Sequence, residues 1–522
     1  MARRTLVGLM LVAAVLATAS MWNDAATADE AAHVASGLLA VTEGRLDFYA
    51  TQAPLIEALE AAPVALAGYR VPGEWKRIGN RPWVVGNLLL YKAGFNPQRI
   101  LTLARIPVIV LFLALAMLVY WFVAETTGNR WAGVAACALT AFCPTMLAHG
   151  RLATVDAGLA LFAFLATVLF LQLLAWPSVI VASLAGIATA FALASKVSGV
   201  IVVPYFAILV ILWTWRTRAT PWRYLLLAAL TAVVAFAGIY MALGRTLDPL
   251  FPFREYLDEI RAVNRFYGDQ YVLPQFLLGE FATGGWPHYN FVALAVKLTI
   301  PSLLVLLLGA LLSLRRPRFE VMAGSLFAGL FLLVSAFSSL NLGIRHVLPI
   351  LPFLYAAGVI AIHDARRGAK ERERRLFDGV VALLIGWHVV TAVVAFPSYI
   401  SYFNPLIGSH RNADRILIDS NLDWGQDLRR LAQWTRDHGI DVMRVHYFGA
   451  GSVEHEFGAR GERWSAPRRQ LLPRGWFAVS RHFYRLSFDP RRSPVNYDEY
   501  LRASGAEFIT SIGGSIDVYR VR

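Results

Sequence analysis

An acidic pair, Asp29-Glu30, directly follows the first long apolar segment of the chain, and His33 comes one helical turn later. Carboxylates and imidazoles are the side chains that most often take or give protons in enzymes. At membrane depth such groups are costly, and they usually face a cavity or a charged partner. The acidic pair and its position indicate proton chemistry at a membrane surface.

The composition is that of a membrane protein. Of 522 residues, 57% are hydrophobic and 16% are charged, against about 25% charged in a soluble domain. The apolar runs are about 18 to 23 residues long, enough to cross a bilayer core. The net charge of +14 comes from Lys and Arg in short loops, which is a topology signal, and we predict no nucleic acid partner. Two cysteines do not indicate a disulfide framework.

We predict an all-α polytopic fold of about eleven spans. They cover residues 5–21, 102–124, 131–148, 155–175, 178–194, 197–214, 223–243, 291–313, 321–339, 346–363 and 378–396. Basic clusters at Arg3-Arg4, 216–223, 315–318 and 366–375 then all lie on one side, which the positive-inside rule makes cytoplasmic. The N-terminus is therefore predicted inside, and the 22–101 loop, the 244–290 loop and the tail outside.

We expect a membrane domain over residues 1–397 and a small exocytoplasmic α/β domain over 398–522. Residues 29–43 and 54–69 of the first outer loop read as helices lying along the membrane interface. In the tail we expect strands at 415–418, 442–448 and 508–521. Asp423 and Gln426 have the spacing of a capping box that opens a helix, and Gly439 is suited to end it.

A cleaved secretory signal is an alternative for residues 1–28. Arg3-Arg4, an apolar stretch and Ala26-Thr27-Ala28 match the general pattern. Cleavage there would make Asp29 the new N-terminus. The apolar stretch is long for a signal core, so we favour a span.

The predicted topology brings the ionisable groups of several spans to the outer side. They are Asp29, Glu30, His33, Arg151, Asp156, Lys196, Lys297, Arg345 and His346. Acids and bases gathered on one side of a bilayer suggest a cavity that handles a phosphate and a proton.

Four stretches carry a resemblance to a known family. They are Asp29-Glu30-x-x-His33, the segment from Gly150 to Asp156, the segment from Leu340 to Pro349, and the segment from Asp419 to Leu428. In this order and on this side, they resemble the polyprenyl-phosphate-dependent glycosyltransferases of the GT-C superfamily. The likeness extends to about residue 450. It is strongest to bacterial relatives of the dolichyl-phosphate-mannose protein mannosyltransferases and of the lipid A aminoarabinose transferase.

The resemblance implies an inverting transfer of a sugar from a polyprenyl-phosphate carrier to an acceptor hydroxyl. Asp29 matches the family's catalytic base. Glu30, His33, Arg151 and Asp156 are implied to line the acceptor side. Lys196, Lys297, Arg345 and His346 are implied to bind the lipid phosphate, for which Arg offers a planar fork and Lys a mobile point charge. No cofactor is certain, but Glu30, His33 and Asp156 are candidate ligands for a divalent cation (Mg, Mn or Zn).

The implied partners are the lipid-linked sugar donor, membrane lipids, and a protein, lipid or glycan acceptor. The implied location is a bacterial plasma membrane. One departure is Gln52-Ala53-Pro54-Leu55, where relatives often carry His-Pro-Pro-Leu, so a contact made by that His is not expected here.

Simpler readings of the same residues remain open. Asp29 fits a helix N-cap, Asp156 a bridge to Arg151, and Lys297 a side chain that snorkels to the headgroups. At the level of the whole chain, the alternative is a lipid or solute transporter without bond chemistry. A transporter is expected to have repeat halves and spans broken near the midplane, and no such halves are visible.

Overall fold

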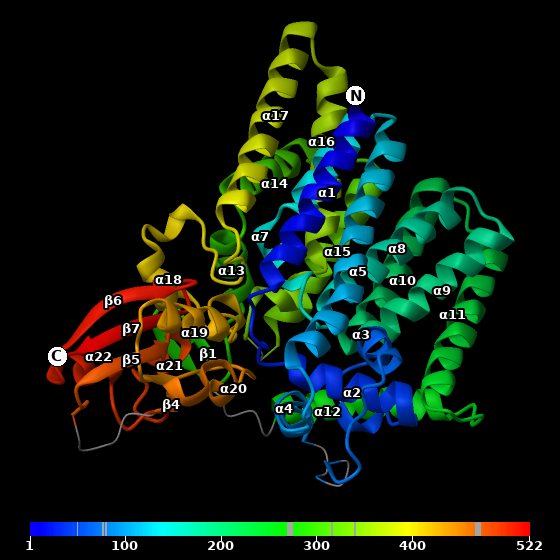
Figure 1. Cartoon of the computed structure of the whole chain (residues 1–522). Helices are drawn as coiled ribbons and strands as arrows, with labels where there is room; N and C mark the ends of the chain where they lie inside the picture. The colour runs from blue at the N-terminus through cyan, green and yellow to red at the C-terminus, as the bar shows by residue number, and fades with distance from the viewer. Residues whose placement is uncertain are drawn as a thin grey trace.

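The computed structural model of the chain describes residues 1–49, 51–75, 78, 81–268, 275–314, 317–338, 341–464 and 471–522. A bundle of long helices runs from the end that carries the N-terminus to the end beside the C-terminal sheet (Figure 1). Its members are α1 (Ala2–Met21), α5 (Pro97–Thr127), α6 (Arg130–Ala141), α7 (Pro144–His149), α8 (Asp156–Ala175), α9 (Val179–Ser195), α10 (Val202–Thr217), α11 (Trp222–Leu243), α13 (Tyr289–Lys297), α14 (Ile300–Ser313), α15 (Phe319–Ala336), α16 (Ile350–Gly368) and α17 (Glu371–Val394).

Each predicted span coincides with one of these helices or with two consecutive ones, so some of the predicted spans are interrupted. Among the described residues, seven helices are long and apolar enough to cross a membrane alone. The pair α13 and α14 makes an eighth candidate only when the two are counted as one span, because the chain bends by 120° between them at Leu298 and Thr299. The 131–148 span is interrupted between α6 and α7, and α9 has only 17 residues. The predicted basic pair Arg315-Arg316 lies outside the described residues.

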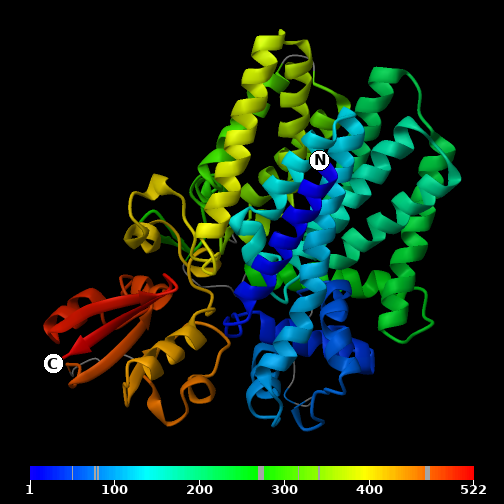
Figure 2. The same cartoon turned by 45° about the horizontal axis from the view of Figure 1, so that its top comes forward.

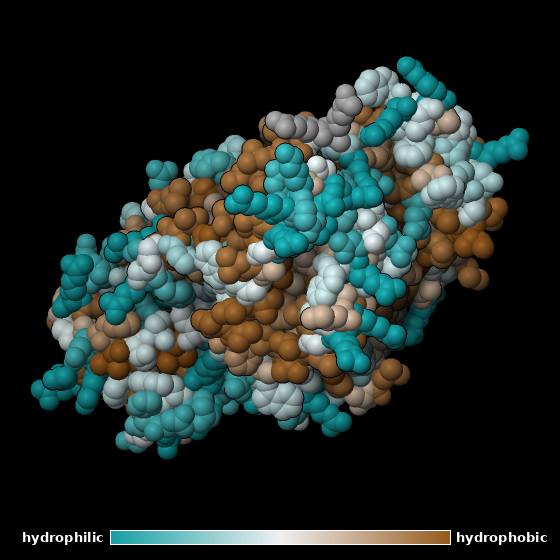
Figure 3. All heavy atoms as spheres, turned by 90° about the horizontal axis from the view of Figure 1, so that it is seen from above, coloured by the Kyte–Doolittle hydropathy of each residue, from teal (hydrophilic) through white to brown (hydrophobic). Residues whose placement is uncertain are grey.

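Large apolar side chains are exposed on several of these helices, among them Val110, Leu230, Val234, Leu307 and Leu383. From above, brown apolar surface reaches the outside beside teal polar groups (Figure 3). Because the chain already buries an extensive core, we attribute this remaining exposed apolar surface to contact with lipid tails. The chain is a multi-pass membrane protein.

Four helices lie across the end of the bundle away from the N-terminus: α2 (Glu30–Glu43), α3 (Pro54–Leu66), α4 (Pro82–Tyr91) and α12 (Phe251–Gly268) (Figure 1). The predicted interfacial segments match α2 and α3. Small residues let these helices pack closely. A Cβ at Gly37 would lie 2.0 Å from the Glu57 carbonyl oxygen, and one at Gly86 would lie 2.0 Å from that of Ala31. Helix α2 is thereby held between α3 and α4.

The C-terminal region contains a five-stranded sheet with the order β4-β3-β5-β7-β6, set beside that same end of the bundle (Figure 2). Its strands are β3 (Met443–His446), β4 (Gly461–Arg463), β5 (Gly475–Ser480), β6 (Ala506–Ile512) and β7 (Ile516–Val521). β3 pairs in parallel with β4 and β5, and the remaining pairs are antiparallel. Its helices are α18 (Ala413–Ile416), α19 (Leu428–Asp437), α20 (Val453–Phe457), α21 (Arg481–Leu486) and α22 (Tyr497–Ala503), and a separate hairpin, β1 (Gln275–Leu277) and β2 (Glu280–Ala282), precedes α13.

Two predictions about the tail are wrong. Residues 415–418 do not form a strand, because the chain turns through α18 there and packs on the membrane core. The capping box does not form either, since the next helix, α19, begins at Leu428 with Asp427 as its N-cap. The Asp423 carboxyl bonds the Gly425 amide, and Gln426 bonds the Trp424 amide. The prediction for Gly439 is confirmed by its left-handed φ of +61° just after α19.

Candidate active site

Asp29 and Arg345 meet at the end of the bundle where α2 begins. Asp29 is the N-cap of α2, as the simpler reading had it, but its side chain makes no capping bond. Its Oδ2 lies 2.8 Å from Nη2 of Arg345, and its Oδ1 accepts a bond of 3.3 Å from Trp83 Nε1. The Asp29 side chain is 17% exposed and that of Arg345 is 10% exposed. The carboxylate is paired but accessible.

Asp156 supplies a second carboxylate beside the same guanidinium. It begins α8, and its Oδ1 accepts a 2.6 Å bond from Lys196 Nζ. Its Oδ2 lies 3.8 Å from Nη1 of Arg345. Arg345 therefore bridges Asp29 and Asp156. We call Asp29, Asp156, Lys196 and Arg345 the bridged cluster.

The ring of Trp424 packs against Arg345 and holds its guanidinium in place. The indole of Trp424 is almost fully buried, and the Arg345 guanidinium lies 4.3 Å from its ring centroid. Stacking of this kind orients a guanidinium without using its N–H groups. The N–H groups thus stay directed at the carboxylates. Trp424 belongs to the stretch that follows the last span, so residues beyond the predicted membrane domain complete this site.

Glu30 has a different environment from its neighbour Asp29. It is fully buried and forms a two-pronged pair with Arg105, with both bonds at 2.7 Å. It also accepts bonds from the amides of Thr27 and Ala153. Burial alone would raise the pKa of Glu30, but Arg105 and these amides leave it lowered. Glu30 therefore anchors the structure, and its carboxylate oxygens are fully engaged by these donors.

His33 lies inside the layer of α2 and α3, away from the bridged cluster's ion pairs. Its Nδ1 lies 2.8 Å from Glu57 Oε1, and Ser36 donates to the other Glu57 oxygen at 2.7 Å. Glu60, one turn further along α3, is fully buried, and neither carboxyl oxygen has a hydrogen-bond partner among the described residues. Burial, reinforced by Glu57, Glu30 and Asp156, raises the pKa of Glu60 well above its usual value.

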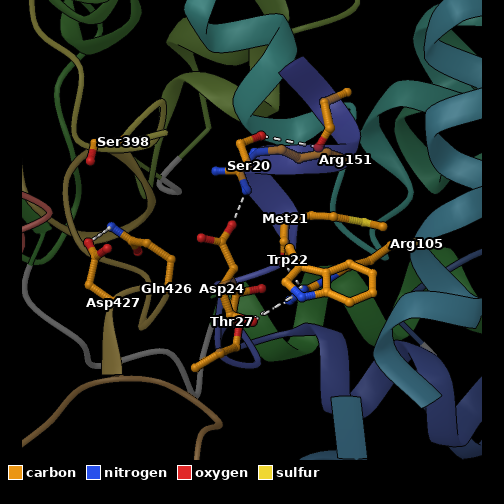
Figure 4. A network of polar contacts seen from close by, with 12 residues as sticks. Ser20, Met21, Trp22, Asp24, Thr27, Arg105, Arg151, Ser398, Gln426 and Asp427 are labelled. Carbon is orange, nitrogen blue, oxygen red and sulfur yellow. Dashed lines mark hydrogen bonds and ion pairs between the residues drawn. The ribbon is translucent and has the colours of Figure 1, made fainter. Parts of the chain in front are cut away.

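Arg151 points toward the C-terminal region and not toward Asp156. Its Nη1 pairs with Asp24, which Arg430 Nη2 also contacts at 2.6 Å. Arg430 in turn pairs with Asp427, the N-cap of α19. We call Asp24, Arg151, Asp427 and Arg430 the docking network. Figure 4 shows Asp24, Arg151 and Asp427 at this junction, with Arg105 close by.

Lys297 also has a structural task. Its three N–H bonds reach the carbonyl oxygens of Ile400, Tyr402 and Asn421, at 2.7, 2.5 and 2.6 Å. An ammonium has three donors, so none remains for a phosphate. The alternative that Lys297 snorkels to the headgroups is also wrong, because Lys297 is buried, with 2% of its surface exposed. His346 stands beside Arg345, and its Nε2 is buried without a partner among the described residues.

The candidate ligands for a divalent cation do not converge. Glu30 is bound to Arg105, His33 to Glu57, and Asp156 to Lys196. Within the described ranges, no group of three or more His, Cys, Asp or Glu side chains has a geometry that could hold a metal ion. The residues present do not fit a resident metal.

Sequence reasoning missed Trp83, Arg105 and Trp424. Arg105 carried a signal, because it is an arginine near the start of an apolar span, which must find a partner. Trp83 carried none, since a tryptophan near a membrane surface is ordinary. Trp424 lies in the segment from Asp419 to Leu428 that carries the family resemblance, but its contact with Arg345 was not predicted.

Comparisons with known proteins agree with this geometry. Residues 100–240 match the family model "Dolichyl-phosphate-mannose-protein mannosyltransferase". The structure of ArnT from Cupriavidus metallidurans in the apo state is similar over 99% of this chain and 97% of that one, with 14% identity and a TM-score of 0.50. No curated protein matches in sequence.

Two further solved structures are similar at lower scores. ArnT from C. metallidurans bound to undecaprenyl phosphate gives 12% identity, 99% and 98% coverage, and a TM-score of 0.49. The oligosaccharyltransferase AglB from Archaeoglobus fulgidus, in complex with an inhibitory peptide and a dolichol-phosphate, gives 12% identity, 99% and 74% coverage, and a TM-score of 0.48. The family match over residues 100–240 and the fold shared with apo ArnT confirm the resemblance to the glycosyltransferases of the GT-C superfamily.

Proposed function

We propose that this chain is an inverting glycosyltransferase that moves a sugar from a polyprenyl-phosphate carrier to an acceptor hydroxyl. The observation that carries the proposal is the bridged cluster, in which the Arg345 guanidinium lies between the accessible carboxylate of Asp29 and the buried carboxylate of Asp156, and Lys196 pairs with Asp156. It lies where α2 and α8 begin, at the end of the bundle beside the C-terminal sheet. The reaction takes place on the exocytoplasmic face of a bacterial plasma membrane, with the N-terminus in the cytoplasm.

Arg345 and Lys196 are the groups that we assign to the donor phosphate. In the chain alone Arg345 pairs with Asp29 and approaches Asp156, and Lys196 pairs with Asp156. The donor phosphodiester carries one negative charge, as each carboxylate does, and gains a second as the phosphate leaves. Arg also matches the geometry of a phosphate, so the phosphate competes with Asp29 for the guanidinium. Donor binding therefore draws Arg345 toward the phosphate and frees Asp29.

Asp29 then acts as the base. An acceptor oxygen attacks the anomeric carbon while Asp29 takes the proton from that oxygen. The bond between the anomeric carbon and the phosphate oxygen breaks, and its electron pair leaves with the phosphate, which Arg345 and Lys196 stabilise. A single displacement inverts the anomeric centre. A positioned base of this kind contributes about 10²- to 10⁴-fold to the rate.

The test uses the full chain in lipid nanodiscs with synthetic short-chain polyprenyl-phosphate sugars. Release of the free lipid phosphate is followed for the wild type, for Asp29→Asn, and for the matched control Asp47→Asn. The Asp47 side chain is 64% exposed and lies in the same loop. We expect at least a 100-fold loss for Asp29→Asn and a change below about twofold for the control. Wild-type turnover by Asp29→Asn excludes Asp29 as the base.

Each assay is repeated with cell-envelope extract added, since a strict transferase releases little lipid phosphate without its acceptor. Folding is checked by thermal unfolding of each purified variant. A wild type that is folded and consumes no donor under either condition refutes the proposal and favours the transporter reading.

A further inference from the structure

Asp419 is a further acidic residue near this site, and its backbone is held in an uncommon conformation. Its φ is +59°, in the left-handed region that residues other than glycine seldom occupy. Its amide donates a 3.2 Å bond to Nδ1 of His482 in α21. Asp and Asn tolerate this region better than most residues, and such conformations concentrate at functional sites. His482 therefore fixes which way the Asp419 side chain leaves the backbone.

The residues after Asp419 attach it to the loop that carries Arg345. Ser420 Oγ donates to the Leu342 carbonyl oxygen at 2.9 Å, and Asn421 Oδ1 accepts from the Ile344 amide at 2.9 Å. Trp424 lies under the Arg345 guanidinium, as described above. Three separate contacts therefore fix the position of residues 420–424 relative to Arg345 and the loop that carries it.

The Asp419 carboxyl lies within electrostatic reach of both Arg345 and Asp29. Burial raises the pKa of Asp419 to about 7, while the Ser420 amide and Arg345 act to lower it and Asp29 acts to raise it. Within the described part of the chain, the carboxyl accepts one hydrogen bond, from the Ser420 amide at 2.6 Å. A desolvated carboxylate offers up to four lone-pair sites, and each additional donor would stabilise it.

The C-terminal sheet supplies the surroundings of this group. His482 comes just after the end of β5, and Phe448 comes just after the end of β3, which pairs with β5 in parallel. The two rings stack with centroids 3.9 Å apart. Ligands commonly bind outside the carboxyl ends of parallel strands. Here that edge of the sheet meets the bridged cluster through Asp419.

We propose that Asp419 binds the acceptor, taking a hydrogen bond from a hydroxyl next to the one that Asp29 deprotonates, so that the preferred acceptor is a saccharide with neighbouring hydroxyl groups. Asp29, which pairs with Arg345, and Asp419, whose carboxyl interacts electrostatically with both, offer acceptors for two adjacent hydroxyl donors, whereas a lone alcohol satisfies only one of them. The proposal rests on the proposed function and assigns the acceptor subsite to the segment that joins the bundle to the C-terminal sheet. Asp419 is a positioning residue for the acceptor and does not take the reacting proton.

The experiment measures how much of the donor sugar is transferred to water and how much is transferred to an added acceptor. Full-length protein in nanodiscs receives a short-chain polyprenyl-phosphate sugar with either methyl α-mannopyranoside, which has neighbouring hydroxyls, or N-acetylthreonine amide, which has one. Free sugar and glycosylated probe are quantified for the wild type and for Asp419→Asn, which keeps the size of the side chain and its tolerance of positive φ. Asp423→Asn is the matched control. Asp423 is buried in the same segment, and its carboxyl bonds the Ser480 hydroxyl and the Gly425 amide.

We expect the wild type to glycosylate the mannoside in preference to the threonine probe. In Asp419→Asn the ratio of mannoside transfer to hydrolysis falls about 10- to 100-fold, the effect of losing a hydrogen bond to a charged group, while hydrolysis changes less than about threefold. In Asp423→Asn the ratio stays at the wild-type value. A damaged fold would lower both reactions together and leave the ratio unchanged.

Three results overturn the inference: an unchanged ratio in Asp419→Asn, an equal fall in the control, or a wild type that hydrolyses the donor but glycosylates only the threonine probe or neither probe. Absence of any donor consumption by the folded wild type refutes the proposed function itself, and so is distinguishable from failure of the acceptor subsite.

Discussion

The bridged cluster and the docking network are built from the same kinds of side chains but differ in how deeply the central carboxylate is buried. In the docking network, Asp24 is fully buried between two guanidinium groups, and Asp427 accepts bonds from Arg430, Ser515 and Gln426. In the bridged cluster, Asp29 is partly exposed and has one guanidinium partner and one weak indole bond. A fully buried ion pair holds a structure together, whereas an accessible pair can exchange its partner for a substrate.

The position of each region in the fold matches this difference. The docking network joins the loop after α1 to the start of α19, and so ties the C-terminal region to the bundle. In the bridged cluster, Trp424 packs against the Arg345 guanidinium and Trp83 donates a hydrogen bond to Asp29. Side chains alone do not separate structure from chemistry here, since Asp24 and Asp29 are five positions apart in sequence and Glu30 is adjacent to Asp29.

The largest effect is expected for Asp24→Asn. The variant leaves Arg151 and Arg430 buried without their shared counter-ion, and breaking a buried pair in this way costs about 3–5 kcal/mol of folding free energy. Thermal unfolding of the purified protein should show a large drop in the midpoint temperature. The specific activity of the molecules that remain folded should stay within about twofold. An unchanged midpoint would show that the network does not hold the two regions together.

Arg345→Gln should have the opposite effect, with a large loss of activity and a smaller loss of stability than Asp24→Asn. It removes the cation that we assign to the leaving phosphate, and loss of one such electrostatic contact costs about 100- to 1000-fold in turnover. Stability should change by less than in Asp24→Asn, because the pair is partly exposed. Lipid-phosphate release and thermal unfolding are measured on the same samples. Arg45→Gln, at a more exposed ion pair in the same end of the molecule, is the control, and equal activity loss in both variants contradicts the assignment.

The smallest effect is expected for Asp423→Asn, which lies between the two regions. Burial raises the pKa of Asp423 to about 7, opposed by the bond from Ser480. The folded state therefore holds this proton more tightly than the unfolded state, so the contribution to stability is fully present below about pH 4 and is lost as pH rises through 7. Asn does not titrate. The unfolding midpoint of the variant should fall less between pH 5 and pH 8 than that of the wild type, and superimposable pH profiles would contradict the expected shift.

The sequence by itself determined the membrane class, the helix positions and the place where charged groups gather. Apolar runs and helix starts are local properties, because a span depends on the hydropathy of about 20 consecutive residues and a cap on its immediate neighbours. The start of α2 at Glu30 and the end of α19 before Gly439 were predictable for this reason. The failed helix start at Asp423 is equally instructive, because its carboxyl bonds locally with Gly425 and distantly with Ser480.

Only the tertiary structure decided which charged residue pairs with which. Asp29 and Arg345 are 316 positions apart, and Glu30 and Arg105 are 75 apart. An ion pair depends on the packing of whole helices, and neighbours on one helix point in different directions. This is why Asp29 reaches the accessible bridged cluster while Glu30, the next residue, is buried against α5. The sequence supplied the charges, and the packing of the bundle against the C-terminal region decided which of them are left available for chemistry.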